Sequence, residues 1–118
     1  MLKVHAKKLH AVEVLTLEGE IISGETEILH SAVQLASGIS DIVLDLANVS
    51  VVDAHGLGVL LELREETLAR GIHMELINVS RPVSRVFQIT RLDTVFQISS
   101  AVPFIPEVAY SQRMRVAA

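Results

Sequence analysis

The chain has 118 residues, of which 50% are hydrophobic and 3% aromatic, and 14 acidic against 10 basic residues give a formal net charge of -4. One domain with an aliphatic core is expected, because a chain of this length has room for a single core. The acidic balance, the shortage of aromatic residues and the lack of a basic stripe argue against a nucleic-acid partner. The absence of cysteine excludes disulfides, thiol catalysis and cysteine metal sites.

No segment predicts secretion or membrane insertion. Residues 1–8 are charged and are not followed by the apolar stretch of a secretory signal. The most apolar region, residues 42–61, is interrupted by Asp45, Asn48 and Asp53. A transmembrane helix needs about 20 predominantly apolar residues, so this region does not predict one. We therefore expect a cytoplasmic protein.

The first predicted elements are two strands. Val4 and its neighbours predict a short strand, and the apolar alternation over residues 12–17 predicts a second one that ends near residues 18–20. Only a short turn separates these two strands. We therefore expect them to pair as an antiparallel hairpin.

The first helix is predicted to follow this hairpin. Ser23 is a candidate N-cap, because its hydroxyl can accept a backbone hydrogen bond. Glu25 and Glu27 favour the positive end of the helix dipole, and apolar residues recur at helical spacing over residues 28–36. Gly38 is expected to stop this helix.

The middle of the chain contains the clearest transition from strand to helix. Residues 42–44 form a nearly continuous apolar run, typical of a strand buried on both faces, and residues 49–52 extend it. From Leu57 the apolar residues fall at helical spacing until Gly71 ends the helix. The turn at residues 53–56 is the predicted functional centre, because a helix N-terminus there presents free N–H groups and favours anions.

The second half continues the alternation of helices and strands. Glu66 and Arg70 are spaced for an i,i+4 pair on the second helix. Residues 74–77 predict another buried strand. Ser80 is then a candidate N-cap for a third helix, with Pro82 tolerated in its first turn.

The order of the elements predicts the fold class. The third helix is expected to carry the apolar residues Val83, Val86, Phe87 and Ile89. Residues 95–98 predict a last strand, and residues 105–114 a C-terminal helix opened by Pro106. We expect an α/β fold with a mostly parallel central sheet, an N-terminal hairpin at one edge and about four helices. It forms a single domain over residues 1–118, with a core over about 4–98.

The central stretch carries a motif that resembles a known family. Residues 42–60 combine an apolar strand containing Asp45 with Asp53, Gly56 and an apolar helix. This is similar to the Asp-Ser-Ser-Gly-Leu pattern of the STAS domain, the family named after sulfate transporters and anti-sigma factor antagonists. Further similar segments are residues 18–21, 70–78 and 83–92. The resemblance spans roughly residues 4–98 and implies a STAS-like single domain.

The resemblance also implies a function. In this family the second Ser of the motif accepts a phosphoryl group from a serine kinase that is also the anti-sigma factor. The unphosphorylated antagonist binds that partner and frees the sigma factor, whereas the phosphate, with a charge of about -1.5 to -2, blocks docking. Here Ala54 and His55 stand at the two serine positions, and Ile22 at the position of a family acid. We expect docking to an anti-sigma factor or serine kinase-like protein, without enzymatic activity and without phosphorylation at the usual position.

The predicted docking surface follows from the same correspondence. Its central residues form the turn and the start of the helix, namely Asp53, Ala54, His55, Gly56 and Leu57. Its neighbouring contacts are Ile22, Ser23 and Gly24. Asp53 is expected to cap the helix, while Gly56 and Gly58 allow a tight helix start and close packing. Neither glycine belongs to a phosphate-binding loop pattern.

The role of His55 is open at the level of sequence. It can be an exposed imidazole without a specific task, a docking residue at a protein interface, or a phosphohistidine or general base. The first two interpretations are compatible, and only Asp53 is available to orient the third. The remaining histidines lack ligand spacing, so neither a metal site nor a cofactor is expected.

Two other functions remain as alternatives. Similar domains serve as accessory subunits of ABC-type lipid-transport complexes, where they pack against the ATPase. A nucleotide-binding protein is the other alternative, supported only by the anion-friendly helix start. A homodimer through exposed helix faces is compatible with each of these functions.

Overall fold

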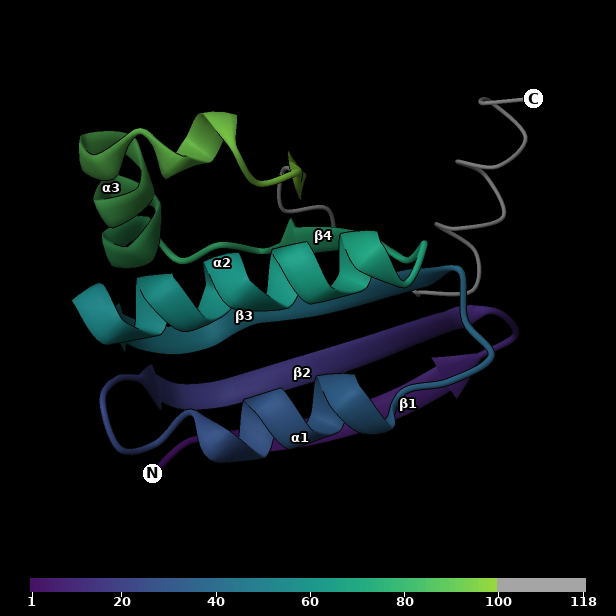
Figure 1. Ribbon diagram of the computed structural model, residues 1–118. Helices are drawn as coiled ribbons and strands as arrows, with labels where there is room; N and C mark the ends of the chain where they lie inside the picture. The colour runs from purple at the N-terminus through teal and green to yellow at the C-terminus, as the bar shows by residue number, and fades with distance from the viewer. Residues whose placement is uncertain (100–118) are drawn as a thin grey trace.

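The fold is organised around a sheet of five strands in the computed structural model, which describes residues 1–99 (Figure 1). The strands are β1 (Lys3–Leu9), β2 (Val12–Ile21), β3 (Asp41–Val52), β4 (His73–Ile77) and β5 (Ile98–Ser99). They lie side by side in the order of the sequence. β1 pairs with β2 in an antiparallel hairpin, and the other neighbours are parallel. The predicted α/β class, with an edge hairpin on a mostly parallel sheet, is confirmed.

Three α-helices connect the parallel strands within the described residues. They are α1 (Glu27–Leu35), α2 (Ala54–Ala69) and α3 (Arg81–Thr90), and a short 3-10 helix, η1 (Leu92–Thr94), follows the last of them. Figure 1 shows α1 and α2 side by side on one face of the sheet, and α3 at the end where α2 begins. None of the described helices is both long and apolar enough to cross a membrane.

The main core lies between the sheet and the helices. Its fully buried members are mostly aliphatic, and they include Leu15, Leu17, Ile42, Leu44, Leu46, Leu60, Leu63 and Leu76. Phe87 and Phe96 join them as an aromatic pair with ring centroids 5.6 Å apart. A smaller cluster of Val12, Val14, Val43 and Ile77 occupies the other face, because side chains alternate along each strand.

Strand β3 is the central element of this sheet. Residues 42–44 are fully buried, which confirms the strand predicted to be covered on both faces. β3 pairs with β2 over nearly all of its length, but its pairing with β4 ends at Asp45 and Ile77. It therefore extends seven residues beyond β4, and this extension carries the start of α2.

The start of the first helix differs from the prediction. α1 begins at Glu27 with Thr26 at the N-cap position, so Ser23 is not its cap. The Glu25 N–H donates to the Ile22 carbonyl at 3.0 Å, which makes residues 22–25 a turn. The prediction was wrong because the backbone of Ser23 is held by Asp53, a contact between distant parts of the chain. At its other end α1 stops at Leu35, before Gly38, which has a φ of 67°.

Two side chains of the later elements have partners other than those predicted. Ser80 does precede α3, but its hydroxyl donates to the Val49 carbonyl at 2.7 Å instead of capping the helix. Arg70 donates to the carbonyl oxygens of Val33 and Ala36 at the end of α1, instead of forming a pair with Glu66. Both side chains therefore connect separate elements of the fold.

The last described residues show one exposed apolar side chain on α3 and a later strand start than predicted. Ile89 is 75% exposed, because α3 packs through Val83 and Phe87 and Ile89 lies about 200° around the helix from Phe87. The last strand starts only at Ile98, since η1 precedes it and Phe96 turns into the core. The predicted helix at residues 105–114 lies outside the described residues.

Candidate functional site

The predicted docking surface lies where β2 and β3 end together. Ile21 and Val52 are partners in the parallel ladder, so the segments that follow them leave the sheet at the same edge. Residues 22–24 and residues 53–57 therefore meet, although about 30 residues of sequence separate them. The carboxyl edge of a parallel sheet is the usual place for binding sites in α/β folds.

The Asp53 side chain joins these two segments. One carboxylate oxygen accepts the Gly56 N–H at 2.8 Å, which confirms Asp53 as the N-cap of α2. The other oxygen accepts the Ser23 N–H at 3.0 Å. These two N–H groups, Ser23 first, hold the pKa of the Asp53 carboxyl below its usual range, and the charge of His55 acts in the same direction. The ionised carboxylate is thus favoured by the fold.

Gly56 allows α2 to start against the end of β2. A Cβ atom built on Gly56 would lie 2.0 Å from the carbonyl oxygen of Ile21, far inside van der Waals contact. The same oxygen accepts the Asp53 N–H at 3.3 Å. Only a residue without a side chain fits here, so the tight helix start expected from the sequence is present. Gly58 has no such neighbour within 4 Å.

The remaining predicted residues divide into an exposed and a packed group. Ala54, His55, Ser23 and Gly24 are exposed, so they are available to a partner. Ile22 and Leu57 are half-buried, and Leu57 packs against the main core. Asp53 and Gly56 shape the turn, and the exposed group forms its accessible surface. We call this group, together with Asp53, the docking turn.

The exposed side chains of the docking turn offer the imidazole of His55 and the hydroxyl of Ser23. Residues 54 and 55 carry no hydroxyl, and the Asp53 carboxylate is engaged by two backbone N–H groups. Within residues 1–99 no group of three or more His, Cys, Asp or Glu side chains could hold a metal ion. The exposed imidazole of His55 can stack or exchange hydrogen bonds with a partner.

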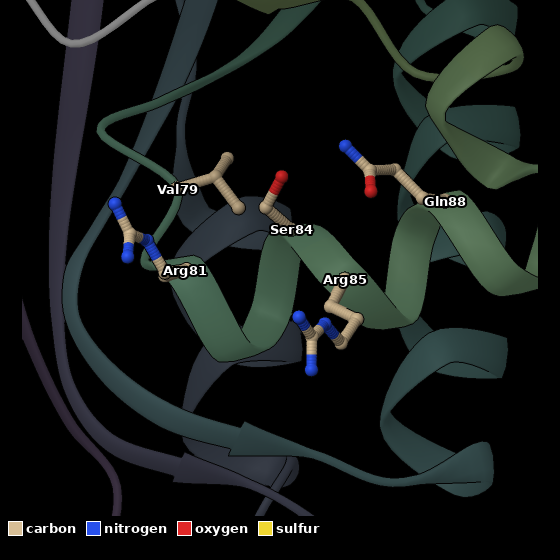
Figure 2. Close-up of a pocket in the computed structure, with 5 residues that line it drawn as sticks. All are labelled: Val79, Arg81, Ser84, Arg85 and Gln88. Atoms are coloured by element: carbon tan, nitrogen blue, oxygen red, sulfur yellow. The ribbon is translucent and has the colours of Figure 1, made fainter.

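A second feature at this end of the molecule was missed by the sequence analysis. Val79, Arg81, Ser84, Arg85 and Gln88 line an open groove of about 600 Å³ along α3 (Figure 2). A signal for it exists in the sequence, since residues 81–92 contain three arginines and no acidic residue. The signal is easily overlooked because the chain as a whole is acidic.

The fold and the site together define a small α/β domain with an accessible surface of loops and helix starts at the carboxyl edge of its sheet. The sequence profile of the STAS domain matches residues 3–105. The chain therefore belongs to the STAS domain family.

Solved structures share this fold. The anti-sigma factor antagonist SpoIIAA in its unphosphorylated form has a TM-score of 0.75 at 22% identity, covering 94% of this chain and 96% of that one. An anti-sigma factor antagonist from Mycobacterium paratuberculosis has a TM-score of 0.73 at 22% identity, with coverages of 96% and 95%. A sulfate transporter family protein from Wolinella succinogenes has a TM-score of 0.68 at 20% identity, with coverages of 92% and 89%.

A pair of glycine substitutions tests the close contact at the start of α2. Gly56→Ala is expected to destabilise the protein by about 1–3 kcal/mol, because the added methyl group collides with the Ile21 carbonyl. Gly58→Ala is the matched control, and it should stabilise the protein by about 0.5–1 kcal/mol, since Ala is favoured over Gly inside a helix. Urea denaturation measures both changes. Equal effects of the two substitutions would contradict the close contact.

The Asp53 contacts predict a specific pH dependence of stability. Folding lowers the pKa of Asp53, so its stabilising contribution is complete above the unfolded-state pKa and is lost as the pH falls through the folded-state pKa. Asp53→Asn replaces one acceptor oxygen by a donor and should lower the Tm by a few degrees at neutral pH. This difference from wild type should narrow as the pH falls through the acid range, because Asp53 is protonated first in the unfolded chain and then, at its lowered pKa, in the folded protein.

Thermal unfolding between pH 7 and pH 3 makes this comparison. Asp93→Asn is the control, because it removes an exposed carboxylate that accepts no hydrogen bond within residues 1–99. A Tm difference for Asp53→Asn that stays constant down to the lowest pH would show that the charge of Asp53 does not stabilise the turn.

Proposed function

We propose that this protein is an anti-sigma factor antagonist of a bacterial partner-switching pathway, which acts in the cytoplasm by docking and not by catalysis. Its partner is an anti-sigma factor or serine kinase-like protein, and the docking turn is the centre of the interface. The observation that carries the proposal is that Asp53 holds residues 22–24 beside residues 53–57 through hydrogen bonds. This arrangement leaves Ala54 and His55 exposed.

The rigidity of the docking turn supports binding. Asp53 holds both segments through backbone hydrogen bonds, and Gly56 lies so close to Ile21 that a side chain would not fit between them. A surface that is ordered before it binds loses less conformational entropy on association. A docking role therefore fits the described geometry better than a role that requires a mobile loop.

The proposal includes the loss of the family's phosphorylation switch at this turn. A phosphate can be transferred only to an acceptor side chain, and Ala54 supplies none, while His55 supplies an imidazole in place of a hydroxyl. Binding to the partner is then constitutive, or it is a decoy interaction, or it is controlled through the partner itself. Each of these modes leaves the docking turn uncharged by phosphate.

Substitution of His55 tests the docking turn directly. His55→Glu places a negative charge at the centre of the proposed interface, and burying this unpaired charge should weaken binding by at least about tenfold. His73→Glu is the matched control. His73 is also exposed, but it lies at the start of β4, at the opposite end of the parallel strands. Calorimetric titration with the serine kinase-like anti-sigma factor of the same genome gives both dissociation constants. Unchanged affinity of His55→Glu would move the interface elsewhere.

Restoring a hydroxyl tests the missing switch. After incubation with the kinase and ATP, we expect no phosphate on residues 54 or 55 of the wild-type protein, and phosphoserine at position 55 in His55→Ser. His55→Ala has the same loss of the imidazole without a hydroxyl and is the control. Mass spectrometry under conditions that preserve phosphohistidine identifies the modified residue. Phosphate on His55 of the wild type would contradict the proposal.

A transport role is the second candidate function. The likeness to a sulfate transporter family protein indicates that this fold also occurs in transport proteins. An accessory subunit of an ABC-type lipid-transport complex would co-purify with an ATPase and a permease, whereas an antagonist would co-purify with a kinase-like anti-sigma factor. Mass spectrometry of proteins retained by the tagged chain from its own cells separates these two candidates.

A further inference from the structure

We infer that the groove along α3 binds an acidic segment of the docking partner, with Arg81 and Arg85 each taking one carboxylate. We call the lining residues Val79, Arg81, Ser84, Arg85 and Gln88 the arginine groove. This inference rests on the proposed function, because it adds a second contact to the same protein partner. The sequence motif at the docking turn does not include any of these residues.

The two arginines are exposed cations without a partner in the described part of the chain. Arg64 pairs with Glu65 at 3.2 Å, and Arg70 donates to carbonyl oxygens of α1, so both have a structural role. No carboxylate or carbonyl oxygen within residues 1–99 accepts a hydrogen bond from Arg81 or Arg85. Their guanidinium groups are therefore free to bind an external anion.

The arrangement of charge on α3 does not serve the stability of the helix. Arg81 and Arg85 stand one helical turn apart, where like charges repel each other. Arg81 also lies in the first turn, where the helix dipole disfavours a cation. Residues 81–92 carry three arginines and no acid, in a chain whose net charge is -4. This concentration of positive charge in an acidic protein fits a ligand with negative charges.

The spacing of the donors fits carboxylates of a peptide segment. Residues four apart on a helix are about 6 Å apart along its axis. Alternate residues of an extended segment lie about 6.6 Å apart and point to the same side, so two acidic side chains at i and i+2 match the axial spacing of residues 81 and 85. Figure 2 shows Ser84 and Gln88 on the same helix, adding a hydroxyl and an amide, and Val79 adding apolar surface.

The arginine groove adjoins the docking turn. The Ser80 hydroxyl, just before α3, donates to the Val49 carbonyl of β3. Val49 is three residues before Val52, and thus about 10 Å along the strand from the end of β3, where the docking turn begins. Figure 1 shows α3 at the same end of the molecule as the start of α2. An interface of ordinary size, about 800 Å² on each partner, can cover both surfaces.

An acidic protein segment fits this groove better than a nucleic acid does. Nucleic acids bind through many phosphate contacts along a broad basic surface. Here the groove presents two cations on one short helix, and the chain as a whole is acidic. Local complementarity with a few carboxylates is what such a patch can provide.

Charge reversal tests the arginine groove against a matched control. The double substitution Arg81→Glu with Arg85→Glu should weaken binding of the anti-sigma factor by at least about tenfold, and should reduce the loss of affinity between about 50 and about 300 mM salt. Lys7→Glu with Lys8→Glu makes the same change in net charge at exposed positions near the end of β1, away from the docking turn, and should have little effect on binding. Arg81→Ala with Arg85→Ala serves as the milder variant if the charge-reversed protein does not fold.

The outcomes separate this inference from the proposed function. If His55→Glu abolishes binding and the arginine substitutions do not change it, the groove is not part of the interface. If only the arginine substitutions weaken binding, the groove inference stands and the docking turn is the wrong centre. If neither set has an effect, both are wrong. A second probe is a short peptide with glutamates at alternate positions, which should bind the wild type more tightly than single-stranded DNA of equal charge; the reverse order would overturn the inference.

Discussion

The carboxylate of Asp53 joins two segments of the chain that are 30 residues apart in sequence. One oxygen holds the first turn of α2, and the other holds the backbone of Ser23 in the preceding loop. Because α2 starts directly at the end of β3, this single side chain fixes the end of the central strand, the direction of the helix and the path of the neighbouring loop. The ionised form is favoured by the same N–H groups that it orders.

Close packing restricts the start of α2 in addition to these hydrogen bonds. Gly56 brings the backbone of α2 against the Ile21 carbonyl, at a distance that excludes any side chain. The next residue, Leu57, is half-buried and packs against the main core. The exposed part of the site consists of four residues, namely Ser23, Gly24, Ala54 and His55. Ala54 and His55 carry no hydroxyl, so this surface offers a methyl group and an imidazole at these two positions.

Features that depend on local sequence could be predicted, and features that depend on contacts between distant segments could not. The buried run at residues 42–44 and the Asp53 cap follow from apolar patterning and from the residue that precedes the helix. Ser23 was predicted to cap the first helix, but its backbone N–H donates to Asp53, which comes much later in the chain. The apolar residues of α3 could be listed from the sequence, but only the packing of Phe87 decides that Ile89 lies on the exposed side of the helix. The groove on α3 depends on how the fold places this helix beside the end of β3, which the local sequence does not determine.

Docking at the turn between β3 and α2 is the central claim, and mapping the partner's footprint by NMR tests it most directly. Addition of the unlabelled anti-sigma factor to the isotope-labelled protein should shift or broaden the backbone amide signals of Ser23, Gly24, Ala54 and His55. The amides at the end of β1, around Lys7 and Lys8, lie at the opposite end of β2 from the docking turn and should stay unchanged. Perturbation confined to the end of β1, with the signals of the docking turn unaffected, would contradict the claim.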